Sequence, residues 1–191
     1  MKTESNQYKK LLSTTNTNIR NSNVKAMLSV NNTLLMLYWD TGKMIDECQQ
    51  KEGWGSSIIP KLSKDIRKKY PNIKGFSVRN LQRMIRFYKE YSTIDTKVPQ
   101  VVAQLPWGHN ILLIEKVKKI SKRFWYMKEA IKEGWSRNKL EMMIKNDLYK
   151  QKGESSFFIT KNLPPANSDI EREILNNQYS NNFFHIYKDF K

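Results

Sequence analysis

The chain has 191 residues, and 39% of them are hydrophobic, which is enough to bury a core in one domain of ordinary size or two small ones. Its net charge of +16 and pI of about 9.8 lie far from the usual balance and predict a polyanionic partner, with nucleic acid as the first candidate. The sequence has no apolar run of about 18 residues and no signal-peptide core. It therefore predicts a cytoplasmic protein without a membrane partner.

The residues available for catalysis or metal binding are few. Cys48 is the only cysteine, and His109 and His185 are the only histidines, so a zinc site is not expected and no metal or cofactor is predicted. His109 lies beside Trp107 and Asn110, but no nucleophile or carboxylate motif accompanies it. We interpret it as a capping or packing residue and predict no catalytic residue.

Residues 1–10 are polar and are expected to be a disordered N-terminus. Residues 11–97 form a first helical half, with a weak helix over 11–20 and a longer one over 22–50, where apolar residues recur at three- and four-residue steps. Gly42 is a candidate for a kink in the longer helix. The next helix begins near Ile58 and stops before Pro71, which disfavours helical geometry in the residue ahead of it.

A second basic helix is predicted over residues 78–91. Ser77 is a candidate N-cap and Gly75 permits a sharp turn before it. At about 100° per residue, Leu81, Ile85 and Tyr88 share the buried side. The opposite side carries Arg79, Arg83 and Arg86, with Gln82 and Lys89 beside them.

This arginine face has two interpretations, a solvated surface or a contact with nucleic acid. Residues 61–89 contain ten Lys or Arg against a single acid, Asp65. A face that is merely solvated usually mixes charges of both signs, so we favour binding to a polyanion. Two helices joined by a short turn resemble a helix-turn-helix, and the candidate DNA contacts on the first helix and the turn are Lys64, Arg67, Lys68 and Lys74.

Residues 98–150 form a second helical half that resembles the first. Helices are predicted over 111–120 and 123–133, and "GWSRNKLEMMIK" at 134–145 then matches "GFSVRNLQRMIR" at 75–86 with an offset of 59 residues. One interpretation is an internal duplication with two helix-turn-helix-like units. The alternative is that capping chemistry places glycine, an aromatic residue and serine at helix starts by chance. Residues 151–191 are expected to be a linker or arm, with a short helix over 169–176 and an aromatic tail.

Several longer motifs resemble the N-terminal domain of the YhcG-type proteins, a bacterial family in which a helical domain precedes a PD-(D/E)xK nuclease domain. The motifs are "VNNTLLMLYWDTGKMI", "GWGSSIIPKLSKDIRKKYP", "GFSVRNLQRMIRFY", "VAQLPWGHNILLIEKVK", "RFWYMKEAIKEGWSRNKLEMMI" and "NLPPANSDI". The resemblance implies a mostly helical, DNA-binding domain that delivers a nuclease to its substrate. Together with the charge count and the helical phase of the arginines, it predicts an all-α protein that binds double-stranded DNA.

The nuclease motif itself is not recognised. The chain contains no Glu-x-Lys triplet, and the Asp-x-Lys at residues 189–191 lies at the C-terminal end. We therefore predict a non-catalytic, DNA-binding domain with little or no sheet. The alternative is a protein-interaction or oligomerisation module that recruits a nuclease or a second copy of itself; RNA binding also stays open.

Overall fold

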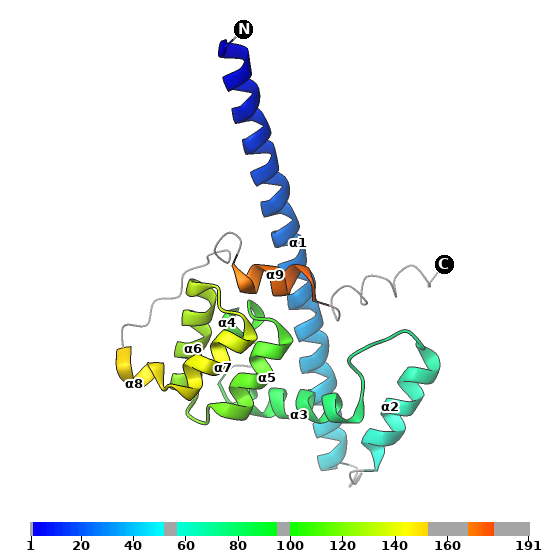
Figure 1. Ribbon diagram of the computed structural model, residues 1–191. Coiled ribbons are helices and arrows are strands. Elements are labelled where there is room, and N and C mark those ends of the chain that lie inside the picture. The colour runs from blue at the N-terminus through cyan, green and yellow to red at the C-terminus, as the bar shows by residue number, and fades with distance from the viewer. Residues whose placement is uncertain (1, 52–56, 95–99, 153–167, 178–191) are drawn as a thin grey trace.

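The computed structural model describes residues 2–51, 57–94, 100–152 and 168–177, and within these ranges every regular element is an α-helix (Figure 1). The helices are α1 (Lys2–Lys51), α2 (Ile58–Lys69), α3 (Val78–Ser92), α4 (Gln100–Ala103), α5 (Trp107–Lys116), α6 (Ile120–Glu133), α7 (Arg137–Lys145), α8 (Leu148–Lys152) and α9 (Asp169–Leu175). The predicted all-α fold is confirmed. Within the same ranges, no helix combines the length and apolarity needed to cross a membrane.

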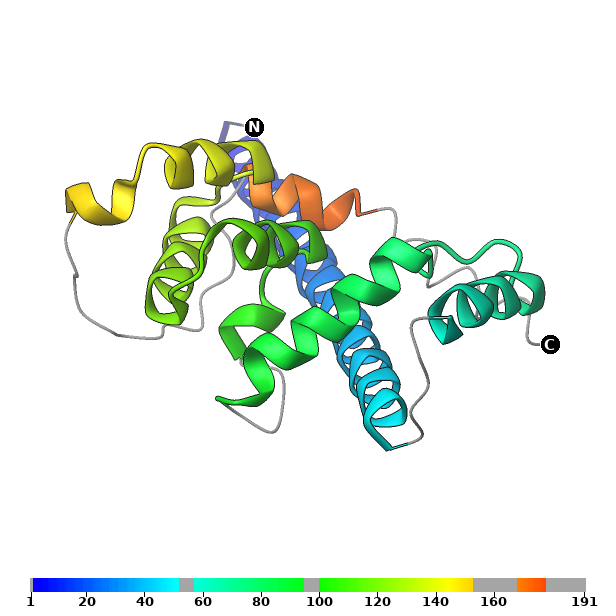
Figure 2. The same ribbon diagram turned by 90° about the horizontal axis from the view of Figure 1, so that it is seen from below.

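Helix α1 is one continuous helix of 50 residues and forms the long axis of the molecule (Figures 1 and 2). The sequence predicted a disordered start and two shorter helices in its place. No glycine or proline occurs between residues 2 and 41, and each residue added to an existing helix gains a backbone hydrogen bond. The helix therefore continues through segments whose polar composition had indicated fraying.

Helix α3 crosses α1 at Gly42. A methyl group at Gly42 would overlap the backbone carbonyl of Met84, so the two helices approach each other more closely than a side chain would permit. The role of Gly42 is thus close helix packing. Ser77 caps α3 as predicted, because its hydroxyl accepts from the backbone N–H of Asn80 at 3.3 Å.

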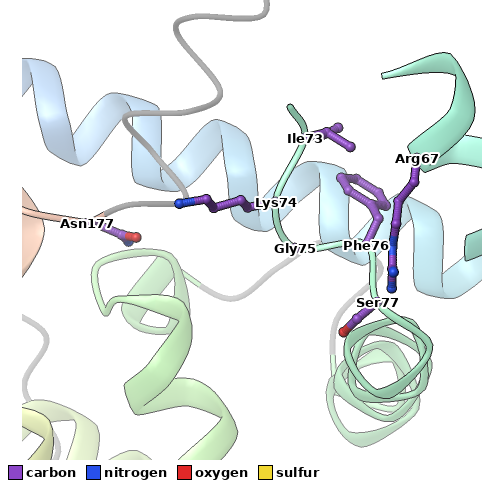
Figure 3. A pocket seen from close by; sticks show the side chains of 7 residues that line it. All are labelled: Arg67, Ile73, Lys74, Gly75, Phe76, Ser77 and Asn177. Carbon is purple, nitrogen blue, oxygen red and sulfur yellow. The ribbon is translucent and has the colours of Figure 1, made fainter. Parts of the chain in front are cut away.

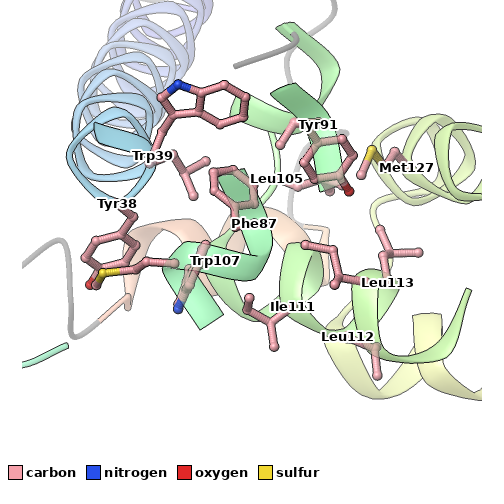
Figure 4. Close-up of a cluster of buried hydrophobic side chains, with 14 of the residues drawn as sticks. Tyr38, Trp39, Phe87, Tyr91, Leu105, Trp107, Ile111, Leu112, Leu113 and Met127 are labelled. Carbon is pink, nitrogen blue, oxygen red and sulfur yellow. The ribbon is translucent and has the colours of Figure 1, made fainter. Parts of the chain in front are cut away.

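The buried side of α3 is wider than the sequence indicated, since Phe87 is fully buried while Tyr88 is only partly so. The Phe87 ring lies 5.8 Å from Trp39 of α1 and 5.2 Å from Trp107 of α5, in edge-to-face contacts (Figure 4). A helix packed on two sides buries more than one stripe. The centre of the core is therefore an aromatic cluster that joins α1, α3 and α5.

Two buried asparagines hold the connection between α4 and α5. Asn31 of α1 donates to the carbonyls of Ala103 and Leu105 at 3.1 and 3.0 Å, and Asn110 donates to that of Val102 at 3.0 Å. Buried backbone carbonyls without partners are costly, so these amides stabilise the connection. Just before this connection, residues 100–103 form the short helix α4.

A buried arginine joins α6 to α3. Arg123, only 1% exposed, donates to the carbonyl of Val117 at 2.9 Å and to the Glu90 carboxylate at 2.9 Å. Its guanidinium also lies over the Tyr91 ring, 5.3 Å from the centroid. Burial raises the pKa of the Tyr91 hydroxyl, although the nearby Arg123 opposes the shift.

Helix α9 lies across α1, where Ile170 and Ile174 are buried. Arg20 of α1 forms a bidentate ion pair with Glu171, at 2.9 and 3.0 Å. The sequence predicted this helix but not its position, because the contact joins residues 151 positions apart. Of the predicted linker or arm and tail over 151–191, residues 153–167 and 178–191 lie outside the described residues.

Candidate nucleic-acid interface

The surface of α2 carries a large excess of positive charge. Residues 58–77 contain six Lys or Arg and a single acid, Asp65. The side chains of Lys61, Lys64 and Lys68 are exposed, and within the described residues none of them forms an ion pair. We call the exposed face formed by these three lysines the α2 basic surface.

The α2 helix is anchored to the start of α3 by its apolar side and by one serine. Ile59 is buried, and the Ser63 hydroxyl donates to the carbonyl of Phe76 at 2.8 Å. Arg67 in turn donates to the Ser63 oxygen at 3.2 Å, which holds its guanidinium near the turn. The charge of α2 is therefore held in a defined position relative to α3.

A hollow of about 490 Å³ lies between the end of α2 and the start of α3 (Figure 3). It is lined by Arg67, Lys74, Ser77 and Asn177, together with Ile73, Gly75 and Phe76. Gly75 has a φ of 96°, a value that favours glycine, and so permits the turn. The structure thus brings the predicted contacts Arg67 and Lys74 to one hollow, beside a residue at the end of α9 that sequence analysis did not identify.

The arginines of α3 have partners within the fold. Arg83 donates to Glu115 of α5, with nitrogen–oxygen distances of 2.8 and 3.2 Å. Arg86 donates to the carbonyl of Ile114 at 2.9 Å and lies 3.6 Å from the carboxylate of Glu90. Both guanidiniums are therefore partly neutralised.

Lys89 also has an acidic partner, Asp46 of α1, at 2.7 Å. Arg79 and Gln82 are exposed, and they line a smaller hollow of about 220 Å³ beside Arg83 and Glu115. Ion pairs at partly exposed sites contribute little stability, so Arg83 and Arg86 can exchange partners at modest cost. Lys89 is held more firmly, because its partner Asp46 is a buried carboxylate. The sequence placed all five residues on one face, and the structure divides them into exposed and paired groups.

The acids that pair with α3 were not predicted from the sequence. Glu115 and Asp46 lie 32 and 43 positions from their partners, and only the packing of α5 and α1 against α3 brings them there. Charge counting over a window of residues does not register such distant neighbours. Glu90, four residues after Arg86, could have been recognised by helical spacing.

The second half repeats the local structure of the first at the predicted offset. Ser136 caps α7 by accepting from the backbone N–H of Lys139 at 3.3 Å, as Ser77 caps α3. Gly134, with a φ of 63°, corresponds to Gly75, and Trp135 is buried as Phe76 is. The connections differ, because three residues separate α6 from α7 whereas eight separate α2 from α3.

A second group of lysines lies where α5 leads into α6. A hollow of about 380 Å³ is lined by Lys116, Lys118, Lys119 and Lys122, together with Val117, Ile144 and Asp147. Lys122 lies 2.6 Å from Asp147, whose pKa is lowered mainly by this hydrogen bond. These lysines are visible in the sequence as the motif "KVKKISK" at residues 116–122, but the position of this motif beside α7 was not predicted.

His109 is a packing residue, as its sequence context indicated. Its side chain is fully buried, and Nε2 lies 2.9 Å from the carbonyl of Trp135, to which it donates when protonated there. Nδ1 lies 3.4 Å from the carboxylate of Glu173. Burial lowers the pKa of His109, although the Glu173 carboxylate opposes this shift.

The described residues contain no group of three or more His, Cys, Asp or Glu that could hold a metal ion. Two Asp-x-Lys triplets occur in the sequence, at residues 95–97 and 189–191, and both lie outside the described residues. The described part of the chain therefore offers a basic surface and no recognisable metal-dependent site.

Comparison with known proteins supports the resemblance found in the sequence. Residues 14–151 match the family model described as the DUF1016 N-terminal domain. The chain is also 25% identical over 165 residues to the Escherichia coli (strain K12) protein named "Putative nuclease YhcG". This match covers 70% of the chain and 43% of the relative, so the chain spans less than half of that protein's length. No solved structure shows a significant match.

Proposed function

Because this chain belongs to the DUF1016 N-terminal domain family, we propose that it binds double-stranded DNA, mainly through phosphates, and so positions a nuclease on its substrate. The relative named "Putative nuclease YhcG" is more than twice as long as the matched segment, and we propose that catalysis belongs to the part of that protein outside the match. The domain itself is a non-catalytic, cytoplasmic DNA-binding module.

The α2 basic surface is the observation that carries this proposal. Lys61, Lys64 and Lys68 are exposed, and in the described part of the chain they have no acidic partner. When unpaired lysines neutralise DNA phosphates, the counterions condensed on those phosphates are released, and this release favours binding. Arg67 and Lys74, at the hollow between α2 and α3, extend this surface toward the start of α3.

The structure changes the ranking of the candidate contacts. Arg83, Arg86 and Lys89 already face carboxylates, so DNA must compete with Glu115, Glu90 and Asp46 for them. Arg79 and Gln82 are exposed at the edge of α3 and remain candidates for direct contact. Lysines bind phosphate as point charges and carry little sequence information, so we propose binding with weak sequence preference.

The α2–α3 and α6–α7 pairs are both candidate helix-turn-helix units. The three-residue connection of α6–α7 has the length typical of that motif, and the eight-residue connection of α2–α3 is longer. The first unit carries the lysines that form no ion pair in the described part of the chain. We therefore place the main contact on α2–α3 and a supporting role on α6–α7.

The test is a binding titration of duplex DNA with the triple variant Lys61→Gln, Lys64→Gln, Lys68→Gln. If these lysines contact phosphates, affinity falls about 10- to 100-fold at low salt, and the slope of log K against log salt decreases by about 2 to 3. Fluorescence anisotropy at several salt concentrations measures both quantities. Parallel titrations with single-stranded DNA and RNA identify the preferred nucleic acid.

The matched control removes the same charge elsewhere, through Lys10→Gln, Lys25→Gln and Lys132→Gln on α1 and α6. All three of these lysines are exposed. If binding depends only on net charge, the two triple variants lose affinity equally, and the assignment to α2 is refuted. If the wild-type protein binds no nucleic acid at low salt, the proposed function itself is refuted.

A further inference from the structure

The first part of α1 projects beyond the helical body (Figure 1). Residues 6–19 are all exposed, and no other described element covers them. Four large apolar side chains lie there nevertheless, with exposed fractions of 65% for Tyr8, 64% for Leu11, 48% for Leu12 and 55% for Ile19. Such exposure on a helix without a neighbour indicates a contact surface.

The apolar residues follow the spacing of a coiled coil. Tyr8, Leu12, Thr15 and Ile19 are separated by steps of four, three and four residues, which places them within about 60° of one another around the helix, with Leu11 beside them. A stripe this narrow is typical of a coiled-coil seam, whereas a helix that packs on a globular core needs a wider apolar face.

The same spacing continues into the part of α1 that carries the body. Ser22, Ala26, Ser29 and Thr33 follow at steps of three, four, three and four, and all are exposed. We call residues 8, 12, 15, 19, 22, 26, 29 and 33 the α1 seam. It extends over almost four heptads, about 38 Å of helix, and none of its residues is charged in a chain that is 27% charged.

The α1 seam faces away from the helical body. The side of α1 that contacts the body carries Val24, Leu35 and Tyr38, and their helical phase lies more than about 100° from the middle of the seam. Arg20, which binds Glu171 of α9, also lies on the body side. A second long helix can therefore lie along the seam without displacing any described element.

From these observations we propose that two copies of this chain associate through their α1 seams as a parallel, two-stranded coiled coil. In a parallel pair each residue meets its own counterpart, so Leu12 and Ile19 pack against apolar side chains. In an antiparallel pair over the same span, Leu12 would face Ser29 and Ile19 would face Ser22. The parallel register therefore keeps the large apolar side chains of the seam together and leaves the small hydroxyl residues to pair with one another.

The interface is small. The partly exposed apolar side chains offer about 400 Å² per copy, roughly half of what a standard stable interface buries on each partner. Each chain also carries a net charge of +16, so the two copies repel one another. We therefore expect a dissociation constant in the micromolar range that becomes tighter as salt screens this repulsion, which is the opposite of the salt dependence of DNA binding.

Sedimentation velocity at about 1 to 100 µM protein measures the association. The variant Leu12→Glu/Ile19→Glu places four like charges in the seam of a dimer and is expected to weaken association at least about 100-fold. The control Thr14→Glu/Thr17→Glu makes the same charge change on exposed residues outside the seam and should associate like the wild type. A monomeric wild type over this range, or equal association of both variants, overturns the proposal.

Cysteine cross-linking tests the direction of the helices. In a Cys48→Ser background, Thr15→Cys should form a disulfide dimer under mild oxidation, because the two copies of residue 15 face each other in a parallel pair. Thr17→Cys lies on the opposite side of α1 and should not. A dimer that cross-links equally through both positions would refute the parallel seam, whether or not the protein binds DNA.

Discussion

The close approach of α1 and α3 predicts opposite effects for the same substitution at two helical glycines. At Gly42, a methyl group would overlap the carbonyl of Met84, and because that neighbour is backbone it cannot rotate away. At Gly108, the nearest atom is Cδ of the Arg137 side chain at 3.5 Å, which is an ordinary contact. Gly42→Ala must therefore separate two helices, whereas Gly108→Ala fits without movement.

The magnitudes follow from two opposing effects. Alanine is favoured over glycine inside a helix by about 1 kcal/mol, and overpacking a core costs about 1–3 kcal/mol or more when backbone must move. Because backbone must move at Gly42, we place the cost there at the upper end of this range or beyond, about 3–4 kcal/mol. After the gain of about 1 kcal/mol is subtracted, we expect Gly42→Ala to lower the free energy of unfolding by about 2–3 kcal/mol. Gly108→Ala, in the first turn of α5 where the propensity gain is smaller, should raise it by up to about 0.5 kcal/mol.

Thermal and urea denaturation followed by circular dichroism measure both variants. For a domain of this size, each 1 kcal/mol corresponds to about 2–4 °C in Tm, so Gly42→Ala should melt roughly 4–12 °C below the wild type. If Gly42→Ala is as stable as Gly108→Ala, α1 and α3 do not cross at this position and the packing described for the core is refuted.

Three further predictions concern groups buried at helix contacts. Glu90→Ala should lower the free energy of unfolding by about 3 kcal/mol in urea denaturation, because it leaves the buried Arg123 guanidinium without its carboxylate. Arg123→Met should lower it less, and equal losses for the two variants would contradict this reasoning. Burial lowers the pKa of His109, so the unfolded chain binds a proton more readily than the folded one. The free energy of unfolding should therefore be at its full value above pH about 6.5 and fall below that pH, and His109→Gln should reduce this dependence. Arg20→Ala should lower the free energy of unfolding by about 2 kcal/mol and speed hydrogen exchange in α9, because Glu171 loses both hydrogen bonds from the guanidinium. Unchanged hydrogen exchange would show that α9 is held by other contacts.

Local features of the fold could be predicted because they depend on neighbouring residues. The cap at Ser77, the end of α2 before Pro71 and the repeat of the Ser77 cap at Ser136 all follow from short-range backbone chemistry. The continuous helix α1 was not predicted, because polar residues without glycine or proline neither favour nor interrupt a helix strongly.

The candidate interface was predictable only in part. Counting charges located the basic segment from α2 to α3, and α2 retains that charge on its surface. The count could not show that Arg83 and Lys89 face Glu115 and Asp46, since these acids come from helices distant in the sequence. Nor could it show that Asn177 of the α9 end lies at the hollow between α2 and α3.

The sequence by itself determined that this chain is helical, strongly basic and a member of its family, because composition, periodicity and motif order are properties of the chain alone. Tertiary structure decided which cations remain without acidic partners and which surface of α1 remains uncovered, within the part of the chain that the structure describes. Ion pairing and burial depend on distances between residues that are far apart in the chain, and only the packing of the helices sets those distances.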